Sequence, residues 1–259
     1  MDDEFNEKEI KELMEKLSKK RPVFDSEDDF KFSLAWEIKE KYRDHVEIRL
    51  EKKMNNNKNA SSLEEEDQNN KNERIDIFII VKNENYMEKI GIELKYFTAK
   101  LVWPYEKNDE KIILKNQAAE NLRRYDAWHD VERLENFIRN RNINKGFAIW
   151  LTNIESVTNC DKIEKKIKKD INKKPNYYNF RICDERQVGP NEILDWKEDT
   201  SDGMKKGRED SINISGYYKV HWEEYNKSNY KKEIPNSLFK YSILEIKNIQ
   251  NNGYFVKNK

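Results

Sequence analysis

The sequence predicts an α/β protein in which helices flank a mixed central sheet. A helix expected over 27–42 precedes three strand-like segments, and a longer helical segment over 115–140 precedes a fourth strand over 145–153. The first strand, VEIRLE (46–51), alternates apolar and charged side chains, which is the period of a strand with one wet face. The fourth, KGFAIWLTN, is almost continuously apolar, as expected of a strand covered on both faces. Helices and strands therefore follow one another within a single core.

Two helices are predicted before the first strand. Residues 4–20 carry apolar side chains at helical spacing, and Pro22 ends that pattern. Ser26 followed by Asp29 resembles a capping box, which places the start of the second helix at about residue 27. Its apolar line is expected to face the core of the domain.

The middle of the chain contains two further strands and an insert. RIDIFIIV (74–81) and KIGIELKYFTAKLV (89–102) are separated by KNENYME, which suits an antiparallel hairpin. Residues 52–73 are rich in Asn, Lys and Glu, so ordering them would cost more conformational entropy than their burial could return. We expect a disordered insert there. Residues 115–140 are expected to form one long helix or two short ones.

These segments divide the chain into three parts. Residues 1–22 form an N-terminal helix, and residues 23–153 form the core that contains the insert near 52–73. Residues 154–259 form a C-terminal extension of partly β character, with a lysine-rich helical stretch over 161–174. That stretch could contact phosphates, or it could be a solvated helix with Ile163, Ile167 and Ile171 packed inward.

Composition limits the classes of function. The 50 basic and 50 acidic residues cancel, so any nucleic-acid site must be a local patch. No run of about 18 apolar residues occurs, and the first residues lack a signal-peptide pattern, so we expect a cytoplasmic protein without a membrane partner. Cys160 and Cys183 indicate neither a disulfide nor a zinc site and are expected to be ordinary buried residues.

Asp76 is an acidic residue in an apolar strand. Because side chains alternate along a strand, Asp76 is expected on the face opposite Ile75, Ile77 and Ile79. A charge on a covered face of a sheet is costly unless it is paired or binds a metal. Asp76 therefore needs a partner.

The next strand supplies candidate partners. In KIGIELKYF, the alternation places Gly91, Glu93 and Lys95 on one face. If the two strands pair with these faces aligned, Asp76 and Glu93 present carboxylates to a common point, which suits Mg²⁺ with several retained waters. Lys95 would then hold or polarise a water for attack on a phosphodiester. The backbone carbonyl of Leu94 is a further candidate metal ligand.

Asp76 and the triplet Glu93-Leu94-Lys95, in this order of elements, resemble the PD-(D/E)XK nuclease superfamily over about residues 24–153. Segments such as RPVFDSEDDF and IELKYFT resemble an uncharacterised prokaryotic group with that fold. The resemblance implies a restriction-endonuclease-like core and hydrolysis of DNA, or of RNA, with Mg²⁺ or Mn²⁺. Ile75 stands at the position where the family pattern has proline, a departure that the pattern tolerates. The oligomeric state is left open, a homodimer included.

The resemblance also suggests residues outside the two strands. In many such nucleases an acidic residue on the first helix completes the metal site, and Glu27 matches it by position, although the helix dipole alone favours acidic residues there. Gln117 matches a glutamine that some relatives carry on the following helix. Arg123, Arg124 and His129 could contact phosphate, but basic residues on a helix more often form a solvated face.

Other interpretations compete with a nuclease. Glu-x-Lys is a common string in a chain this charged, and it also begins at Glu9, Glu37, Glu51, Glu164 and Glu245. Only the last is a serious competitor, because it stands in the strand-like segment YSILEIK. The three charges could instead form a surface ion network between strands. A catalytically inactive nucleic-acid-binding or regulatory protein, and a carboxylate-pair hydrolase acting on sugars, are the alternative functions.

Overall fold

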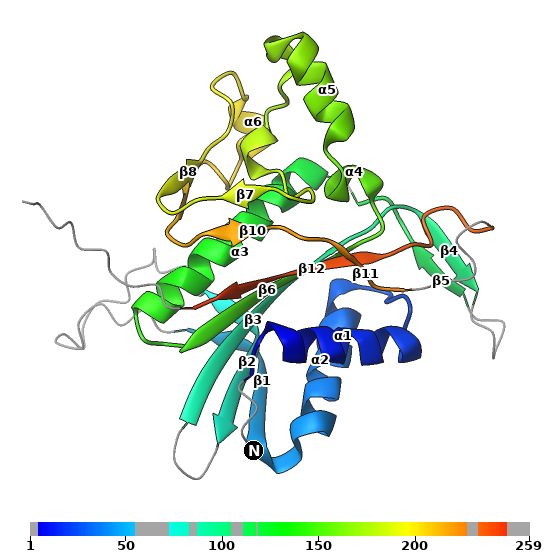
Figure 1. Ribbon diagram of the computed structural model, residues 1–259, viewed down its shortest axis with the longest axis vertical. Helices are drawn as coiled ribbons and strands as arrows, with labels where there is room; N and C mark the ends of the chain where they lie inside the picture. The colour runs from blue at the N-terminus through cyan, green and yellow to red at the C-terminus, as the bar shows by residue number, and fades with distance from the viewer. Residues whose placement is uncertain are drawn as a thin grey trace, which may run out of the picture.

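The protein is described by a computed structural model over residues 5–54, 73–82, 87–104, 111–117, 119–226 and 233–247. Within these ranges the chain folds around a mixed six-stranded sheet with helices on both faces (Figure 1). The sheet order is β1 (Val46–Lys53), β2 (Arg74–Lys82), β3 (Met87–Phe97), β6 (Lys145–Thr152), β12 (Lys240–Ile246) and β11 (Glu223–Glu224). The predicted α/β class with a mixed central sheet is confirmed.

The helices are α1 (Glu7–Lys20), α2 (Glu27–Tyr42), α3 (Glu120–Arg139), α4 (Glu155–Thr158), α5 (Asp161–Lys169) and α6 (Asp202–Lys205). Short 3-10 helices span Arg43–His45, Ile171–Lys173 and Tyr178–Phe180. Three small two-stranded sheets pair β4 (Leu101–Pro104) with β5 (Lys111–Leu114), β7 (Gln187–Val188) with β10 (Tyr218–Lys219), and β8 (Glu192–Leu194) with β9 (Ile212–Ile214).

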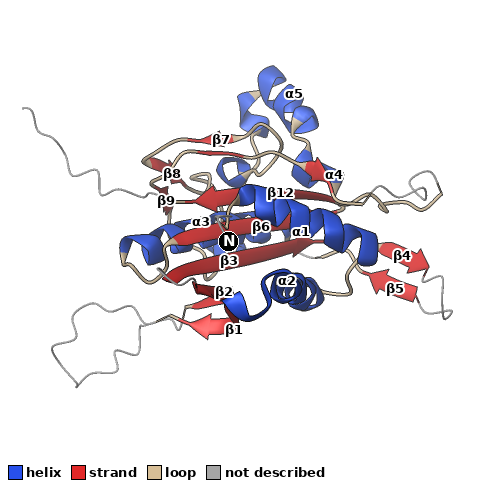
Figure 2. Ribbon diagram, turned by 60° about the horizontal axis from the view of Figure 1, so that its bottom comes forward, coloured by secondary structure: helices blue, strands red, loops and turns tan. Residues whose placement is uncertain are grey.

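The connection between β3 and β6 makes the sheet mixed. These two strands pair in parallel, from Ile90↔Lys145 to Phe97↔Thr152, and α3 links them. Parallel neighbours need such a crossover, whereas the remaining pairs of the central sheet are antiparallel. Figure 2 shows α1 and α2 on the opposite side of the sheet from α3. The sheet is therefore buried on both faces.

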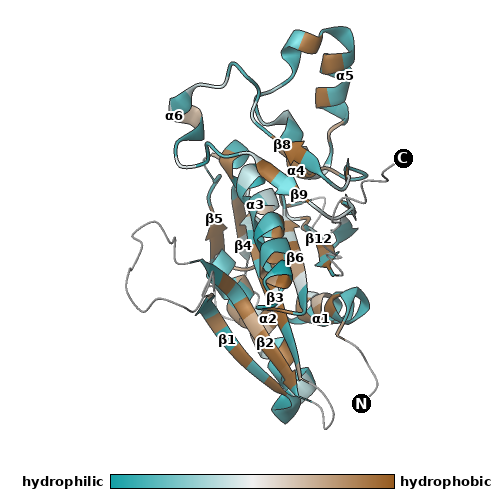
Figure 3. Cartoon of the chain, turned by 90° about the vertical axis from the view of Figure 1, so that its left-hand side faces the viewer, coloured by the Kyte–Doolittle hydropathy of each residue, from teal (hydrophilic) through white to brown (hydrophobic). Residues whose placement is uncertain are grey.

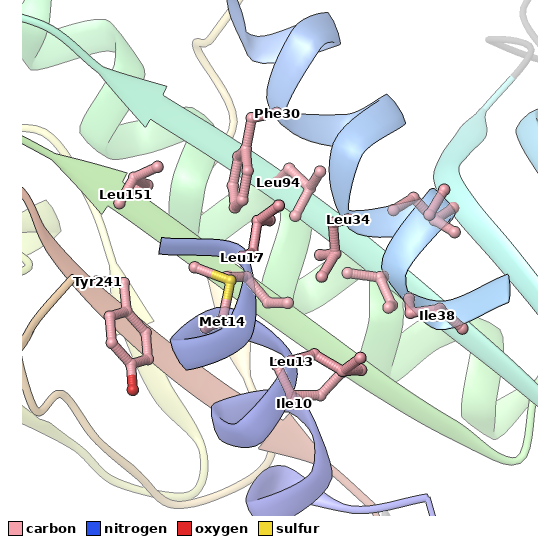
Figure 4. Close-up of a cluster of buried hydrophobic side chains, with 14 of the residues drawn as sticks. Ile10, Leu13, Met14, Leu17, Phe30, Leu34, Ile38, Leu94, Leu151 and Tyr241 are labelled. Atoms are coloured by element: carbon pink, nitrogen blue, oxygen red, sulfur yellow. The ribbon is translucent and has the colours of Figure 1, made fainter. Parts of the chain in front are cut away.

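Helices α1 and α2 cover one face of the sheet. Asn6 caps α1 and Ser26 caps α2, each accepting a backbone N–H three residues on. The predicted start of the second helix is thereby confirmed. Buried side chains of both helices pack against β3, β6 and β12, and Figure 4 labels ten members of the cluster: Ile10, Leu13, Met14, Leu17, Phe30, Leu34, Ile38, Leu94, Leu151 and Tyr241.

Helix α3 covers the other face and approaches the sheet closely. Leu134 is fully buried and lies over the two glycines of neighbouring strands, Gly91 in β3 and Gly146 in β6. A Cβ atom at either glycine would lie 3.2 Å from the Leu134 side chain. Residues 115–140 thus contain a single helix that begins at Glu120, later than predicted, and Ala118 lies outside the described residues.

The strand predicted over 89–102 is wrong in its extent, because β3 ends at Phe97 and a separate hairpin begins at Leu101. Side-chain amides take the backbone N–H groups between the two strands. Gln117 accepts from Thr98, Asn153 from Ala99 and Asn116 from Lys100. These hydrogen bonds replace the backbone bonds of a paired strand, and the chain leaves the central sheet at this point.

The C-terminal extension contributes to the central sheet. All seven residues of β12 pair antiparallel with β6, from Lys240↔Thr152 to Ile246↔Gly146. Residues 240–246 therefore complete the sheet that the core begins. Most of the predicted insert, residues 55–72, lies outside the described residues, as do residues 83–86 of the predicted turn. Strand β1 runs two residues further than predicted, to Lys53.

Helix α5 departs from its predicted inward packing. Ile163 and Ile167 are half-buried and Ile171, just beyond the helix, is 66% exposed. No residue of α5 is buried. Among the described residues, no helix is both long and apolar enough to span a membrane.

Cys160 and Cys183 form a disulfide, so the prediction of two ordinary thiols is wrong. The cysteines stand 23 positions apart in the sequence, but their Cα atoms lie 5.6 Å apart. The chain between them folds back, and the Asp184 N–H donates to the Thr158 carbonyl at 2.9 Å. The spacing of the two cysteines in the sequence does not show that the tertiary structure brings them together.

We expect Leu134→Ala to lower the free energy of unfolding by about 2–5 kcal/mol, because it empties the space above two glycines that cannot fill it. Urea denaturation measures the effect. Ile193→Ala, at a side chain that is 62% exposed, is the control and should change stability little. Equal losses in the two variants would contradict the close packing of α3.

We expect the double variant Cys160→Ser, Cys183→Ser to lose about 3 kcal/mol of unfolding free energy, because the bond closes a loop of roughly 23 residues in the unfolded chain. Urea denaturation with and without a thiol reductant measures the loss. The reductant should destabilise the native protein and leave the double variant unchanged. Alkylation of both cysteines in native, unreduced protein would show that the bond does not form.

Candidate functional site

A pocket of about 390 Å³ opens where β2 separates from β3. Pairing of these strands stops at Ile77↔Ile92, whereas β1 and β2 stay paired as far as Lys53↔Arg74. Beyond Ile92, no described strand pairs with β3 on this edge. The pocket is lined by Glu27, Glu51, Glu73, Arg74, Asp76, Glu93, Lys95, His129, Asp130 and Arg133, from both strands and from the neighbouring β1, α2 and α3.

Two carboxylates take the place of β2 along the edge of β3. The N–H of Leu94 donates to Asp76 Oδ2 at 2.8 Å, and the N–H of Tyr96 donates to Glu27 Oε2 at 2.7 Å. Backbone donors left unpaired in a part-buried position would destabilise the fold. Each carboxylate also has a second oxygen, which the strand does not use.

Two cationic side chains satisfy the carbonyls of the same residues. Lys95 Nζ donates to the Leu94 carbonyl at 3.2 Å, and Arg123 Nη2 donates to the Tyr96 carbonyl at 2.8 Å. Arg123 Nη2 also lies 3.2 Å from Glu27 Oε2. Four side chains therefore complete the hydrogen bonding of this strand edge, and three of them line the pocket.

The alternation predicted for β2 is broken at its start. Ile75, expected on the face of Ile77 and Ile79, packs instead in the cluster beneath α3, where a Cβ on Gly91 would lie 2.9 Å from Ile75 Cδ1. In the facing strand, Glu51 is skipped in the register and has a φ of 50°, a left-handed conformation that is unfavourable without glycine. This local distortion reorients the end of β2.

Glu93 is the most deeply buried acidic residue of the pocket. It is 2% exposed, and its Oε1 lies 2.5 Å from Nη2 of Arg133, yet no described donor reaches that oxygen in hydrogen-bond geometry. Burial raises the pKa of Glu93 well above its usual value, against the opposing charge of Arg133. Asp130 and Asp76 raise the pKa of Glu93 further.

Lys95 forms an ion pair with Asp130. Burial alone would lower the pKa of Lys95, but the negative charges of Asp130, Glu27 and Glu93 outweigh it and raise that pKa. The Lys95 side chain is therefore a protonated cation at neutral pH. It acts as a fixed positive charge in the pocket rather than as a base.

The pocket carries an excess of negative charge. Six lining residues are Asp or Glu and three are Lys or Arg, which leaves a formal charge of −3 when every carboxyl is ionised. Lys31, whose Nζ lies 3.5 Å from Asp76 Oδ1, and Arg123, whose Nη2 lies 3.2 Å from Glu27 Oε2, reduce the excess to about one charge. Burial raises the pKa of Asp76 and of Glu27 as well. A bound cation would relieve this repulsion.

The structure brings together four of the predicted site residues: Glu27, Asp76, Glu93 and Lys95 all line the pocket. Gln117 is not among the lining residues. It precedes α3 instead of lying on it, and its side chain and backbone are both bonded to Thr98. Leu94 contributes its backbone, with the carbonyl bonded to Lys95.

Asp130 and Arg133 are pocket residues that the sequence interpretation missed. They stand three positions apart on α3, and Arg133 Nη2 lies 3.1 Å from Asp130 Oδ1. A signal was available, because Asp130 falls on the same helical stripe as the buried Ala127 and Leu134. An acidic residue among apolar residues that face a sheet needs a partner, as Asp76 does.

The basic residues of α3 do not form the solvated face that the sequence favours. Arg124 is fully buried, and its Nη2 bonds to Glu120 and to the Ser156 carbonyl. Arg123 completes the strand edge described above. His129 lines the pocket, with its ring stacked on Tyr125 at 5.9 Å between centroids. Residues of the C-terminal extension pack on part of this helix, for example Trp196 on Tyr125.

Two other acidic groups of the described residues lack comparable surroundings. Glu245 begins the second Glu-x-Lys triplet that stands in a strand. It accepts a hydrogen bond from Lys247, and its Oε1 lies 3.9 Å from Lys145 Nζ, so its charge is paired with two lysines. Asp184, Glu185 and His221 are close enough to hold a metal ion, but all three are exposed. The group around His221 lacks the burial of the pocket between β2 and β3, and Glu245, although its side chain is only 11% exposed, lies outside that pocket.

No protein-family model matches this chain, and no curated protein or solved structure matches it significantly. The fold class therefore follows from the chain's own sheet topology. Function is inferred from the chemistry of the pocket.

We expect Glu93→Gln to raise the free energy of unfolding at pH 8 and to have less effect at pH 5. A carboxyl whose folded pKa is raised stabilises the fold fully below its unfolded pKa and loses that contribution as the pH rises through the folded pKa. Because the folded pKa of Glu93 lies well above its usual value, we expect the gain in the free energy of unfolding at pH 8 to exceed the gain at pH 5.

Urea denaturation in a metal chelator at the two pH values measures the difference. Glu245→Gln, in the second strand-borne triplet, is the matched control. Lower stability of Glu93→Gln at both pH values would show that Arg133 compensates the Glu93 charge fully.

Proposed function

We propose that this chain is a magnesium-dependent nuclease of the PD-(D/E)XK, restriction-endonuclease-like type that hydrolyses phosphodiester bonds, in DNA in preference to RNA. One observation carries the proposal: Asp76, Glu93 and Lys95 line a single pocket, together with Glu27. Apart from the β4–β5 hairpin between β3 and α3, the element order α2, β1, β2, β3, α3, β6 agrees with the core of that superfamily.

The donors of the pocket fit a hard divalent cation. Carboxylate oxygens of Asp76 and Glu93, with Glu27 and the Leu94 carbonyl as further candidates, are ligands that Mg²⁺ and Mn²⁺ accept. Glu93 Oε1 is buried and faces Arg133 Nη2 at 2.5 Å outside hydrogen-bond geometry, and the lining residues carry an excess of negative charge. When bound, the metal supplies charge neutralisation at the phosphate and a water of lowered pKa.

Lys95 supplies the fixed positive charge of the proposed reaction. Its ammonium donates to a non-bridging oxygen of the scissile phosphate and stabilises the negative charge that develops there. Asp130 holds Lys95 in place through their ion pair, and Arg133 holds both Asp130 and Glu93. The side chains are thereby oriented before the substrate arrives, which lowers the reorganisation that the reaction requires.

The same charges make the proposed activity depend strictly on metal. An unoccupied pocket with excess negative charge repels a phosphodiester, so the substrate binds productively only after a cation has entered. A chelator should therefore abolish hydrolysis, and not only slow it.

We expect the purified protein to cleave DNA with Mg²⁺ or Mn²⁺, and Glu93→Ala and Lys95→Ala each to lower the rate by at least about 10²-fold. Linear, circular and single-stranded DNA, with RNA in parallel, are incubated with and without metal and resolved on gels. Lys247→Ala, which alters the second strand-borne triplet, is the control and should cleave like the unaltered protein.

Each contrary result identifies a different error. Cleavage that survives both Glu93→Ala and Lys95→Ala would remove the pocket from the reaction. Failure of the unaltered protein to cleave any substrate with either metal would favour a catalytically inactive binding protein. Chelator-resistant hydrolysis of a glycan without need of Lys95 would favour a carboxylate-pair glycosidase.

The disulfide bears on the expected cytoplasmic location. Cytosolic reductants disfavour disulfides, so the bond between Cys160 and Cys183 counts against that location. Free-thiol labelling of the protein in intact cells, compared with the purified protein, tests it directly.

A further inference from the structure

The lysines of α5 carry positive charge that no described acidic residue neutralises. The helix contains Lys162, Lys165, Lys166, Lys168 and Lys169, and all five side chains are exposed. None of them forms an ion pair with a described residue. Helix α1 is different, because Lys8, Lys11, Lys16, Lys19 and Lys20 are each paired with Glu. In a chain of zero net charge, α5 is a local basic patch.

Four of these lysines share one face of α5. Lys162, Lys165, Lys166 and Lys169 follow the spacing i, i+3, i+4, i+7, which makes a stripe along a helix. The half-buried Ile163 and Ile167 lie on another side. We call these four residues the lysine stripe.

The acidic residues of α5 are directed elsewhere. Asp161 and Glu164 line a groove of about 630 Å³ at the foot of the helix, where Arg181 and Arg186 are also found. Asp184 and Glu185 line the same groove. The groove has four acidic lining residues against three basic ones, Arg181, Arg186 and Lys240, whereas the outward lysine stripe carries only positive charge, so the stripe is the surface that suits an anion.

The base of α5 is covalently anchored. Its N-cap residue is Cys160, which is bonded to Cys183. Figure 1 shows α5 projecting at the top of the molecule, and Figure 3 shows it as mainly hydrophilic with a few hydrophobic bands. Helix α5 thus holds the lysine stripe away from the central sheet, and the disulfide fixes the residue that caps this helix.

We propose that the lysine stripe of α5 binds the phosphate backbone of a nucleic-acid duplex. This inference rests on the proposed nuclease function and assigns the C-terminal extension to gripping the substrate. From Lys162 to Lys169 a helix rises about 10 Å, and phosphates follow one another at about 3.4 Å along the axis of each strand, so the stripe can contact about three phosphates. Such contacts add affinity without sequence preference.

The apolar side of α5 argues for nucleic acid over a lipid surface. Helices that lie in a membrane interface bury a broad apolar face, commonly with Trp, Phe or Leu. Helix α5 has only two isoleucines, both already half-buried against the protein. Lysines without a large apolar face suit a phosphate backbone better than a bilayer.

The test measures binding apart from cleavage. Glu93→Gln protein in a chelator is titrated against a fluorescein-labelled DNA duplex by anisotropy at several KCl concentrations. A second protein carries four additional changes in the lysine stripe: Lys162→Gln, Lys165→Gln, Lys166→Gln and Lys169→Gln. We expect at least about tenfold weaker binding at low salt and a salt-dependence slope reduced by about three.

The control removes the same amount of charge from other exposed lysines. It carries Lys8→Gln, Lys19→Gln, Lys82→Gln and Lys247→Gln, and it should bind nearly as tightly as its parent. Circular dichroism of all three proteins confirms that each is folded. Equal weakening in the control and the stripe variant would show a net-charge effect and overturn the proposal.

Two further outcomes would also overturn it. One is the absence of duplex binding by the parent protein. The other is stripe-dependent sedimentation with phosphatidylserine vesicles in place of DNA binding. Because no metal is present, failure of the nuclease proposal would leave stripe-dependent DNA binding intact. Failure of the stripe proposal would leave metal-dependent cleavage intact.

Discussion

The edge of β3 beyond Ile92 is the constraint on which the pocket depends. There β2 leaves, and the N–H and carbonyl groups of Leu94 and Tyr96 lose their strand partner. Asp76, Glu27, Lys95 and Arg123 bond to those four groups instead. Buried backbone polar groups must be paired, so the fold requires polar side chains at this point, and here all four are charged. The same requirement assembles the candidate site.

This arrangement stabilises the backbone but crowds charge into a covered space. Glu93 makes no bond to the strand edge, and its burial beside Asp130 and Asp76 raises its pKa. A residue that served only stability would be apolar or fully hydrogen-bonded at such a position. Retaining an incompletely satisfied carboxylate beside other acids is typical of a site that binds a cation or performs chemistry. Arg133 and Lys95 balance only part of the charge.

The C-terminal extension has two structural roles. Its last described strand, β12, pairs with seven of the eight residues of β6 and extends the sheet that supports the pocket. Its loops cover α3, where Trp196 stacks on Tyr125, the ring that in turn stacks on His129. One wall of the pocket is thereby fixed by residues far away in the sequence. A domain boundary at residue 153 would separate the candidate site residues from elements that hold them in place.

The sequence by itself determined the α/β class, the two N-terminal helices, the strands of the core and the association of Asp76 with Glu93 and Lys95. These follow from local periodicity and from charges that stand out in apolar segments, which each segment carries without its neighbours. Tertiary structure decided where β3 ends, how Ile75 turns, that Cys160 meets Cys183, and that Asp130 and Arg133 join the pocket. Gln117 lies outside the pocket for the same reason, since its partner is the backbone at Thr98. Such contacts depend on which distant segments of the chain pack together, and a local sequence pattern does not predict this packing.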